Sequence, residues 1–141
     1  MFNGWLFAAG VLDALGSGMH LACIAGGPAW YRFFGAGERM VRLAERRSWK
    51  APLVTGAIAT ILASWSAYSF SGAGVLRPLP LLRPALVAIS AAYLVRAAML
   101  PLMLKWMPDR SRSFLVVSSL IVLGFGIVHA IGIASSWNVL G

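Results

Sequence analysis

Three side chains that could do chemistry lie in one apolar stretch near the start of the chain, Gly4–Gly26. They are Asp13, Ser17 and His20, and their spacing of i, i+4 and i+7 places them on one face of a helix. A nucleophile–base–orienter chain needs the histidine between the other two groups, and this order on one face does not provide it. The pattern argues against catalysis without deciding whether the chain is an enzyme, and it predicts no catalytic residue.

Two further polar residues, Arg96 and His129, also lie in long apolar stretches. A charge at the centre of a bilayer costs about 2.5–3.5 kcal/mol on insertion scales, so Asp13 and Arg96 are expected to face inward and to pair. With a rise of about 1.5 Å per residue, His129 falls at the level of Asp13, while His20 lies roughly 12 Å deeper than His129. The predicted intramembrane polar cluster is therefore Asp13, Arg96, His129, His20 and Ser17.

Three interpretations of this cluster compete. It can be a structural ion pair of Asp13 and Arg96 with His129 hydrogen-bonded nearby. It can be a proton or substrate site in which Asp13 changes its protonation state, although a neighbouring arginine would hold the carboxylate charged. It can also bind a cofactor through the histidines. A single haem ligated by His20 and His129 conflicts with their different depths, but a haem or quinone shared with a partner subunit stays open.

Composition identifies the class of protein. Of 141 residues, 60% are hydrophobic and only 11% are charged, whereas a soluble domain averages about 25% charged residues. The net charge of +8 could suggest nucleic acid, but a nucleic-acid-binding protein would not be this apolar, so no nucleic acid is expected. The chain is predicted to form a single membrane domain over residues 1–141. Its one cysteine excludes an internal disulfide.

Hydropathy predicts an all-α integral membrane protein, a four-transmembrane-helix bundle with spans at about 4–26, 51–71, 84–104 and 113–137. Pro101 is expected to bend the third span near its end. Tryptophans fall at predicted span ends, as interfacial anchors do. In the first span a file of small residues at every fourth position is expected to let another helix approach closely. The members of this file are Gly10, Ala14, Gly18, Ala22 and Gly26.

The positive charges predict the orientation. Six lie between the first two spans and three between the last two, and only Arg77 and Arg83 lie on the opposite side. The positive-inside rule then places both termini outside a bacterial inner membrane. The segment 38–47 is predicted to be a short interfacial amphipathic helix that contacts anionic lipid headgroups or a partner protein. The residues assigned to this contact are Arg32, Arg39, Arg42, Arg46, Arg47 and Lys50.

The function expected from these features is small-solute or proton-linked transport through Asp13, Arg96 and His129. One alternative is a non-catalytic accessory or assembly subunit of a membrane complex, and a second is a membrane redox protein that binds haem or quinone. The lipid bilayer is the expected partner, and association with copies of the chain or with a larger complex stays open. No metal site is predicted, because no loop carries a metal-binding cluster.

Overall fold

The computed structural model describes residues 1–140, and over these residues the chain is entirely helical, with seven helices and no strand. The helices are α1 (Gly4–Gly26), α2 (Pro28–Phe33), α3 (Glu38–Glu45), α4 (Lys50–Gly72), α5 (Leu82–Ala98), α6 (Leu100–Trp106) and α7 (Arg112–Ser135). Helices α1, α4 and α7 are each long and apolar enough to cross a membrane, and α5 with α6 makes a fourth candidate if the bent pair is one span. The molecule therefore has the features of a membrane protein.

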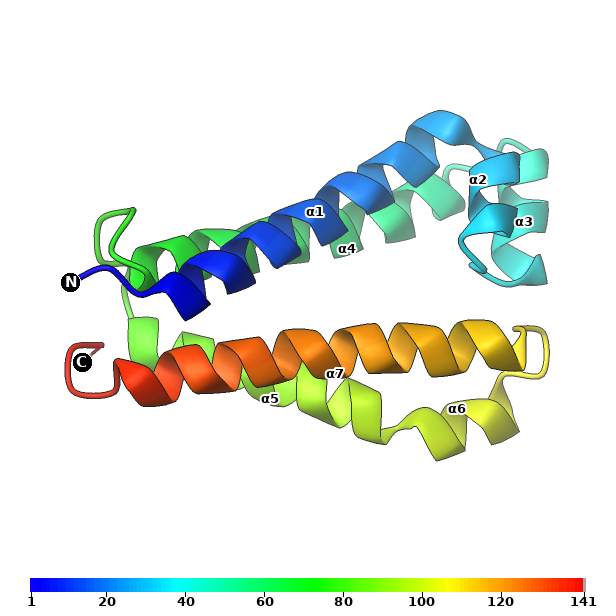
Figure 1. Cartoon of the computed structure of the whole chain (residues 1–141). Coiled ribbons are helices and arrows are strands. Elements are labelled where there is room, and N and C mark those ends of the chain that lie inside the picture. The colour runs from blue at the N-terminus through cyan, green and yellow to red at the C-terminus, as the bar shows by residue number, and fades with distance from the viewer. Residues whose placement is uncertain (141) are drawn as a thin grey trace.

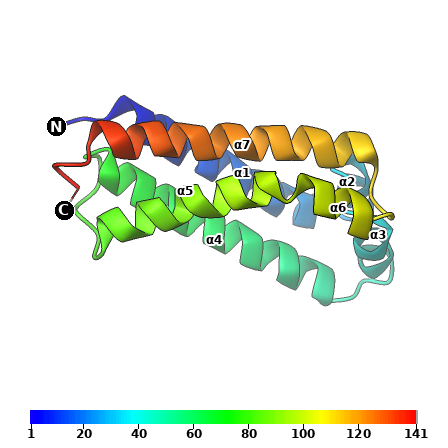
Figure 2. The same cartoon turned by 90° about the horizontal axis from the view of Figure 1, so that it is seen from below.

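The long helices form two antiparallel pairs, α1 with α4 and α5 with α7 (Figures 1 and 2). The two pairs lie close together at the end that holds both termini and the α4–α5 connection, and they diverge toward α2 and α3 (Figure 1). Helices α2 and α3 fill the connection between α1 and α4 at the wide end. Any site that needs residues from both pairs is therefore favoured nearer the narrow end.

The predicted third span is broken into two helices, as the sequence predicts from Pro101. Helices α5 and α6 meet at an angle of 51° across Met99. Proline has no backbone N–H, and its ring clashes with the carbonyl four residues earlier, here that of Ala97, so the helix cannot continue straight. The bend starts one turn after Arg96 and redirects the chain at the wide end.

Asn3 ties the start of α1 to the end of α7. Its side-chain oxygen accepts hydrogen bonds from the backbone N–H groups of Trp5 and Leu6, at 2.9 and 3.0 Å, which caps α1. Its amide nitrogen donates to the carbonyl oxygen of Gly132 at 2.8 Å and to the hydroxyl of Ser136. The polar groups at two helix ends thus satisfy one another and hold the narrow end closed.

The predicted file of small residues is only in part a packing seam. Gly10 is buried, where a Cβ would lie 2.8 Å from the Phe70 ring, but Ala14 and Gly18 are exposed and Gly18 has no neighbour within 4 Å. The seam instead uses hydroxyls, since Ser17 donates to the Ala59 carbonyl oxygen at 2.8 Å. The buried face of α1 consists mostly of small and polar side chains, and large apolar side chains such as Leu15 and Leu21 face outward.

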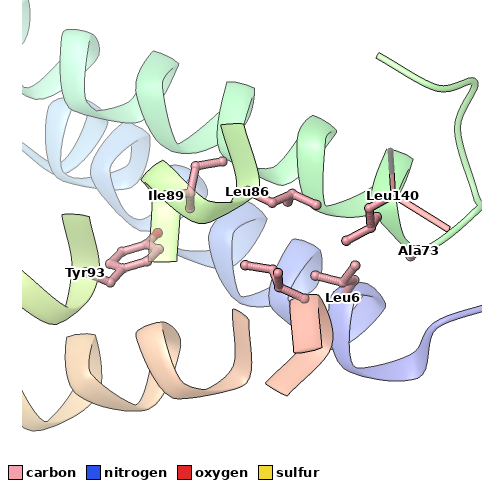
Figure 3. Close-up of a cluster of buried hydrophobic side chains, with 7 residues drawn as sticks. Leu6, Ala73, Leu86, Ile89, Tyr93 and Leu140 are labelled. Carbon is pink, nitrogen blue, oxygen red and sulfur yellow. The ribbon is translucent and has the colours of Figure 1, made fainter. Parts of the chain in front are cut away.

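Two apolar clusters flank the middle of the molecule. The first lies at the narrow end, where Leu6, Leu86 and Leu140 meet, with Ile89 and Tyr93 farther along toward the centre (Figure 3). Gly72 permits this meeting, because a Cβ there would lie within 3.0 Å of both Leu6 and Leu86. The second cluster, at the wide end, contains Cys23, Tyr31, Val41 and Ala51.

Helix α3 packs its apolar side chains onto this second cluster. Val41 is buried, and Met40, Leu43 and Ala44 lie against the cluster, while Arg39, Arg42 and Arg46 are exposed. The period of the pattern is that of a helix, and much of its apolar face is covered by the chain's own residues. A contact of α3 with lipid would therefore be made mainly by its arginines.

Candidate functional site

A buried polar cluster lies where the two helix pairs meet, and every long helix supplies one member. Asp13 comes from α1, Ser69 from α4, Tyr93 from α5 and His129 from α7. Asp13, Ser69 and His129 are fully buried, and Tyr93 is 6% exposed. A buried carboxylate is costly unless it is paired and hydrogen-bonded, and here both of its oxygens have partners.

The contacts within the cluster are short. The Tyr93 hydroxyl donates to Asp13 Oδ1 at 2.6 Å. His129 Nε2 lies 3.1 Å from Asp13 Oδ2. Ser69 Oγ lies 3.2 Å from Asp13 Oδ2 and 3.1 Å from His129 Nε2. On its other side, His129 Nδ1 lies 2.8 Å from the carbonyl oxygen of Phe125.

These contacts determine how many protons the pair can hold. A carbonyl oxygen only accepts, so the proton facing Phe125 is on Nδ1 of His129. An ionised Asp13 oxygen and an unprotonated Nε2 would then point lone pairs at each other across 3.1 Å. One proton must lie between them, on the carboxyl or on the ring. In both arrangements the pair has no net charge, which is the state that a low-dielectric setting favours.

Loss of that proton would leave a negative charge in a dry site. The Ser69 hydroxyl faces both acceptors but has a single hydrogen, so it can satisfy only one of them. Aromatic rings enclose the other side, since Trp65 and Phe125 pack edge-on against Tyr93 with centroids 5.0 and 5.5 Å away. The contact between Asp13 of α1 and His129 of α7 therefore needs the one proton that lies between them.

The predicted proximity of Asp13 and His129 is present, but the predicted Asp13–Arg96 ion pair is not found in the described part of the chain. Arg96 is half-buried and donates to the hydroxyls of Ser119 and Ser118, at 3.1 and 3.5 Å. The reason is the divergence of the two helix pairs. Arg96 lies one turn closer to the wide end than Tyr93, where α7 is nearer to α5 than α1 is (Figure 1).

Ser17 and His20 lie on the expected face of α1 but outside the cluster. Ser17 is buried and bonds to α4, while His20 is half-buried with Nδ1 2.7 Å from the Gly16 carbonyl oxygen. Both nitrogens of His129 are engaged by protein atoms, so the geometry gives no support to its ligation of a haem iron. Within residues 1–140 no three histidine, cysteine or acidic side chains gather in a way that could hold a metal ion.

Sequence reasoning missed Ser69 and Tyr93. Tyr93 lies one turn before Arg96 on the same side of the predicted third span, and Arg96 was chosen as the partner of Asp13 because it is charged. Ser69 is one of several serines in α4, and only the packing shows which of them meets Asp13. For Tyr93 the depth was a usable signal, because Tyr93 and Asp13 each lie nine residues inside the outer end of their predicted spans, whereas Ser69 lies two residues from the end of its span and gave no such signal.

The predicted headgroup-contact residues gather at the wide end, on and around α2 and α3. Arg32 pairs with Glu45 at 2.7 Å, and Arg42 lies 4.0 Å from Glu38, both at exposed positions. Within the described chain Arg39, Arg46, Arg47 and Lys50 form no ion pair. Exposed surface pairs contribute little to stability, so this surface carries a net positive charge that is available to other molecules.

Comparison with known proteins identifies no relative. No family model matches the chain, and no curated protein and no solved structure matches it.

Proposed function

We propose that this chain is a four-span bacterial inner-membrane protein in which α1, α4, α5 with α6, and α7 cross the bilayer. Support comes from the charges at the two ends. The wide end carries the arginines around α2 and α3 together with Lys105, Arg110 and Arg112, and the narrow end carries Arg77 and Arg83. The positive-inside rule then places the wide end in the cytoplasm and both termini outside, with α3 facing anionic lipid headgroups through its arginines.

Cysteine labelling tests this orientation. In a Cys23→Ser background, an impermeant maleimide should label Arg77→Cys in intact cells and should label Arg46→Cys only after permeabilisation. Both positions are exposed, so accessibility within the protein does not separate them. Labelling of Arg46→Cys in intact cells would reverse the proposed topology.

The activity we propose is proton-linked movement of a small solute, with Asp13 and His129 as the proton site. The observation that carries it is a buried carboxylate–imidazole pair, completed by Ser69 and Tyr93, at the meeting point of four candidate spans. Intramembrane ionisable residues are costly and mark proton relays and substrate pathways. Arg96, which was expected to hold Asp13 charged, is bonded to Ser119 and Ser118 instead.

Because the cluster lies between the two helix pairs, its protonation would affect how closely the pairs pack. Asp13 and Ser69 belong to one helix pair, and Tyr93 and His129 belong to the other. Three of the cluster's four contacts therefore cross between the pairs, and the remaining one joins Ser69 to Asp13. Release of the proton leaves two acceptors facing each other and favours separation of the pairs at this level. A transporter needs a structural element that can adopt two arrangements, and binding of the ligand must favour one of them.

Asp13→Asn tests the proton site. The asparagine amide can donate to His129 Nε2, and its oxygen can accept from Tyr93, so the variant imitates the protonated carboxyl and should fold with nearly native stability. Infrared difference spectra between acidic and alkaline buffer should show the carboxylic-acid carbonyl band of a buried group in the native protein. That band should be missing in Asp13→Asn, and the growth or uptake phenotype in the native host should be lost.

Asp109→Asn is the matched control, because Asp109 is an exposed carboxyl at the wide end, and it should leave both the band and the phenotype unchanged. A full native phenotype with folded Asp13→Asn would contradict the transport proposal.

A non-catalytic accessory subunit is the second candidate, and one observation favours it. An apolar hollow of about 400 Å³ on α2 is lined by Ala29, Trp30, Phe33 and Phe34, and the Phe33 side chain is 82% exposed. Such a surface at a span end suits either lipid or a partner protein. If the chain serves by docking, the host phenotype should be lost on Phe33→Ser and should persist on Asp13→Asn.

A further inference from the structure

A second cavity lies at the narrow end, beside the termini and the α4–α5 connection. Its volume is about 690 Å³, which falls in the range of small-molecule sites. Most of the residues that line it have apolar side chains, and among the described lining residues Arg83 has the one charged side chain. The principal apolar wall residues are Leu76, Leu79, Leu82, Pro84 and Val139.

The Arg83 guanidinium is only partly satisfied. One terminal nitrogen donates to the carbonyl oxygen of Trp137 at 2.9 Å, and the guanidinium carbon lies 4.8 Å from the centre of the Trp137 ring. Arg83 Nε is buried without a hydrogen-bond partner, and among the described side chains it is the single nitrogen or oxygen in that condition. A buried donor without an acceptor is costly and calls for an explanation.

None of the four acidic side chains in the sequence pairs with Arg83. Asp13 is enclosed in the buried cluster. The other three lie at the wide end, Glu38 and Glu45 on α3 and Asp109 in the α6–α7 connection. Arg83 forms no ion pair within the described chain. A cation beside a cavity with apolar side chains, unpaired with any acidic side chain of the described residues, is the chemistry that recognises an anion with an apolar body.

The cavity is separate from the Asp13 cluster. Its lining includes Gly72 and Leu140, and these residues contact Leu6 and Leu86 of the narrow-end apolar cluster (Figure 3). Leu6 precedes Asp13 by seven residues on α1, which corresponds to about 10 Å along the helix. A molecule in the cavity would therefore sit on the outer side of an apolar layer and would not touch the proton site.

We propose that this cavity binds an amphiphilic anion, with its acidic head on Arg83 and its apolar body against the leucine and proline walls. A rotation of the guanidinium, held by one carbonyl bond and the Trp137 ring, would bring Nε to the incoming oxygen and satisfy it. The head can be the carboxylate of a free acid or the phosphate of a membrane lipid. Binding of this anion does not depend on the proposed transport activity. Its identification as the transported solute would rest on the proposed function.

Octanoate, octanol and octylamine test the proposal, since they share an apolar body and differ in the charge of the head. Binding is measured by calorimetry on the full chain in phosphatidylcholine nanodiscs near pH 7, with protein-free nanodiscs as the partitioning baseline. Octanoate should bind at least about tenfold more tightly than octanol, and octylamine should bind most weakly. Arg83→Gln should lower octanoate affinity by about tenfold or more while octanol binding stays unchanged, which also shows that the variant is folded.

Arg77→Gln is the matched control, because Arg77 is exposed in the α4–α5 connection just before the helix that carries Arg83, and it does not line the cavity. Equal octanoate affinity for native protein and Arg83→Gln, or no octanoate binding by the native protein, would overturn the proposal. Repeating the titration in phosphatidylglycerol nanodiscs separates the two sources. Weakened octanoate binding there assigns the site to an anionic lipid, and unchanged binding assigns it to a free acid. Octanoate should also bind to Asp13→Asn, which would show that binding in the cavity does not depend on the proton site.

Discussion

Replacing Asp13 by alanine is expected to lower the free energy of unfolding by about 3–5 kcal/mol, the range observed when one partner of a buried ion pair is removed. The change removes the acceptor of the Tyr93 hydroxyl and one acceptor of Ser69, and it leaves His129 Nε2 with Ser69 alone. All of these groups are buried, so water cannot replace the lost partner. Equilibrium unfolding of the purified protein in detergent or nanodiscs measures the loss.

Two companion variants make this result specific. Asp13→Asn keeps a donor and an acceptor in the same place and should lose much less than Asp13→Ala. Asp109→Ala removes an exposed carboxyl and should change stability by no more than about 0.5 kcal/mol. If Asp13→Ala unfolded at the same point as Asp109→Ala, the hydrogen bonds around Asp13 would contribute nothing to the fold.

The contact between Gly132 and Leu6 should be nearly as sensitive. A Cβ on residue 132 would lie 2.8 Å from Leu6 Cγ and Cδ2 and 3.1 Å from the Leu6 backbone nitrogen. The side chain can yield but the backbone cannot, so α1 and α7 must move apart, which also strains the bond from Asn3 to the Gly132 carbonyl oxygen. Gly132→Ala is expected to cost about 1–3 kcal/mol, measured by the same unfolding experiment.

A double-mutant cycle with Leu6→Ala separates overpacking from a general effect of alanine. Leu6→Ala alone should lower the free energy of unfolding by about 2 kcal/mol, mainly because it leaves a cavity. The loss is at the low end for such a change, because in lipid the leucine side chain has an apolar setting in the unfolded state as well. Gly132→Ala should then cost less in the Leu6→Ala background than in the native one. Gly18→Ala is the control on α1, where nothing lies within 4 Å, and it should be neutral or slightly stabilising. Strictly additive losses for residues 6 and 132 would show that this contact does not set the spacing of the helices.

The helices themselves could be predicted closely from the sequence. The first predicted span coincides with α1, and those at 51–71 and 113–137 differ from α4 and α7 by at most two residues at either end. The bend near Pro101 was also foreseen. Hydropathy over about 20 residues, capping side chains and proline act locally along the chain, so they can be read without knowing which helices are neighbours. Helix α2 was not predicted, because its six residues are too few to show a period.

The composition of the buried site was decided by the tertiary structure. From the sequence, Asp13 was expected to pair with Arg96, since both charges need compensation and one side chain could span the distance. In the structure the two helix pairs diverge toward the wide end, so one helical turn along α5 separates a residue that touches α1 from one that touches α7. Tyr93 therefore bonds to Asp13, and Arg96 bonds to Ser119. Depth along each span follows from sequence position alone, whereas the distance between spans depends on how glycines such as Gly72 and Gly132 let particular leucines pack between them.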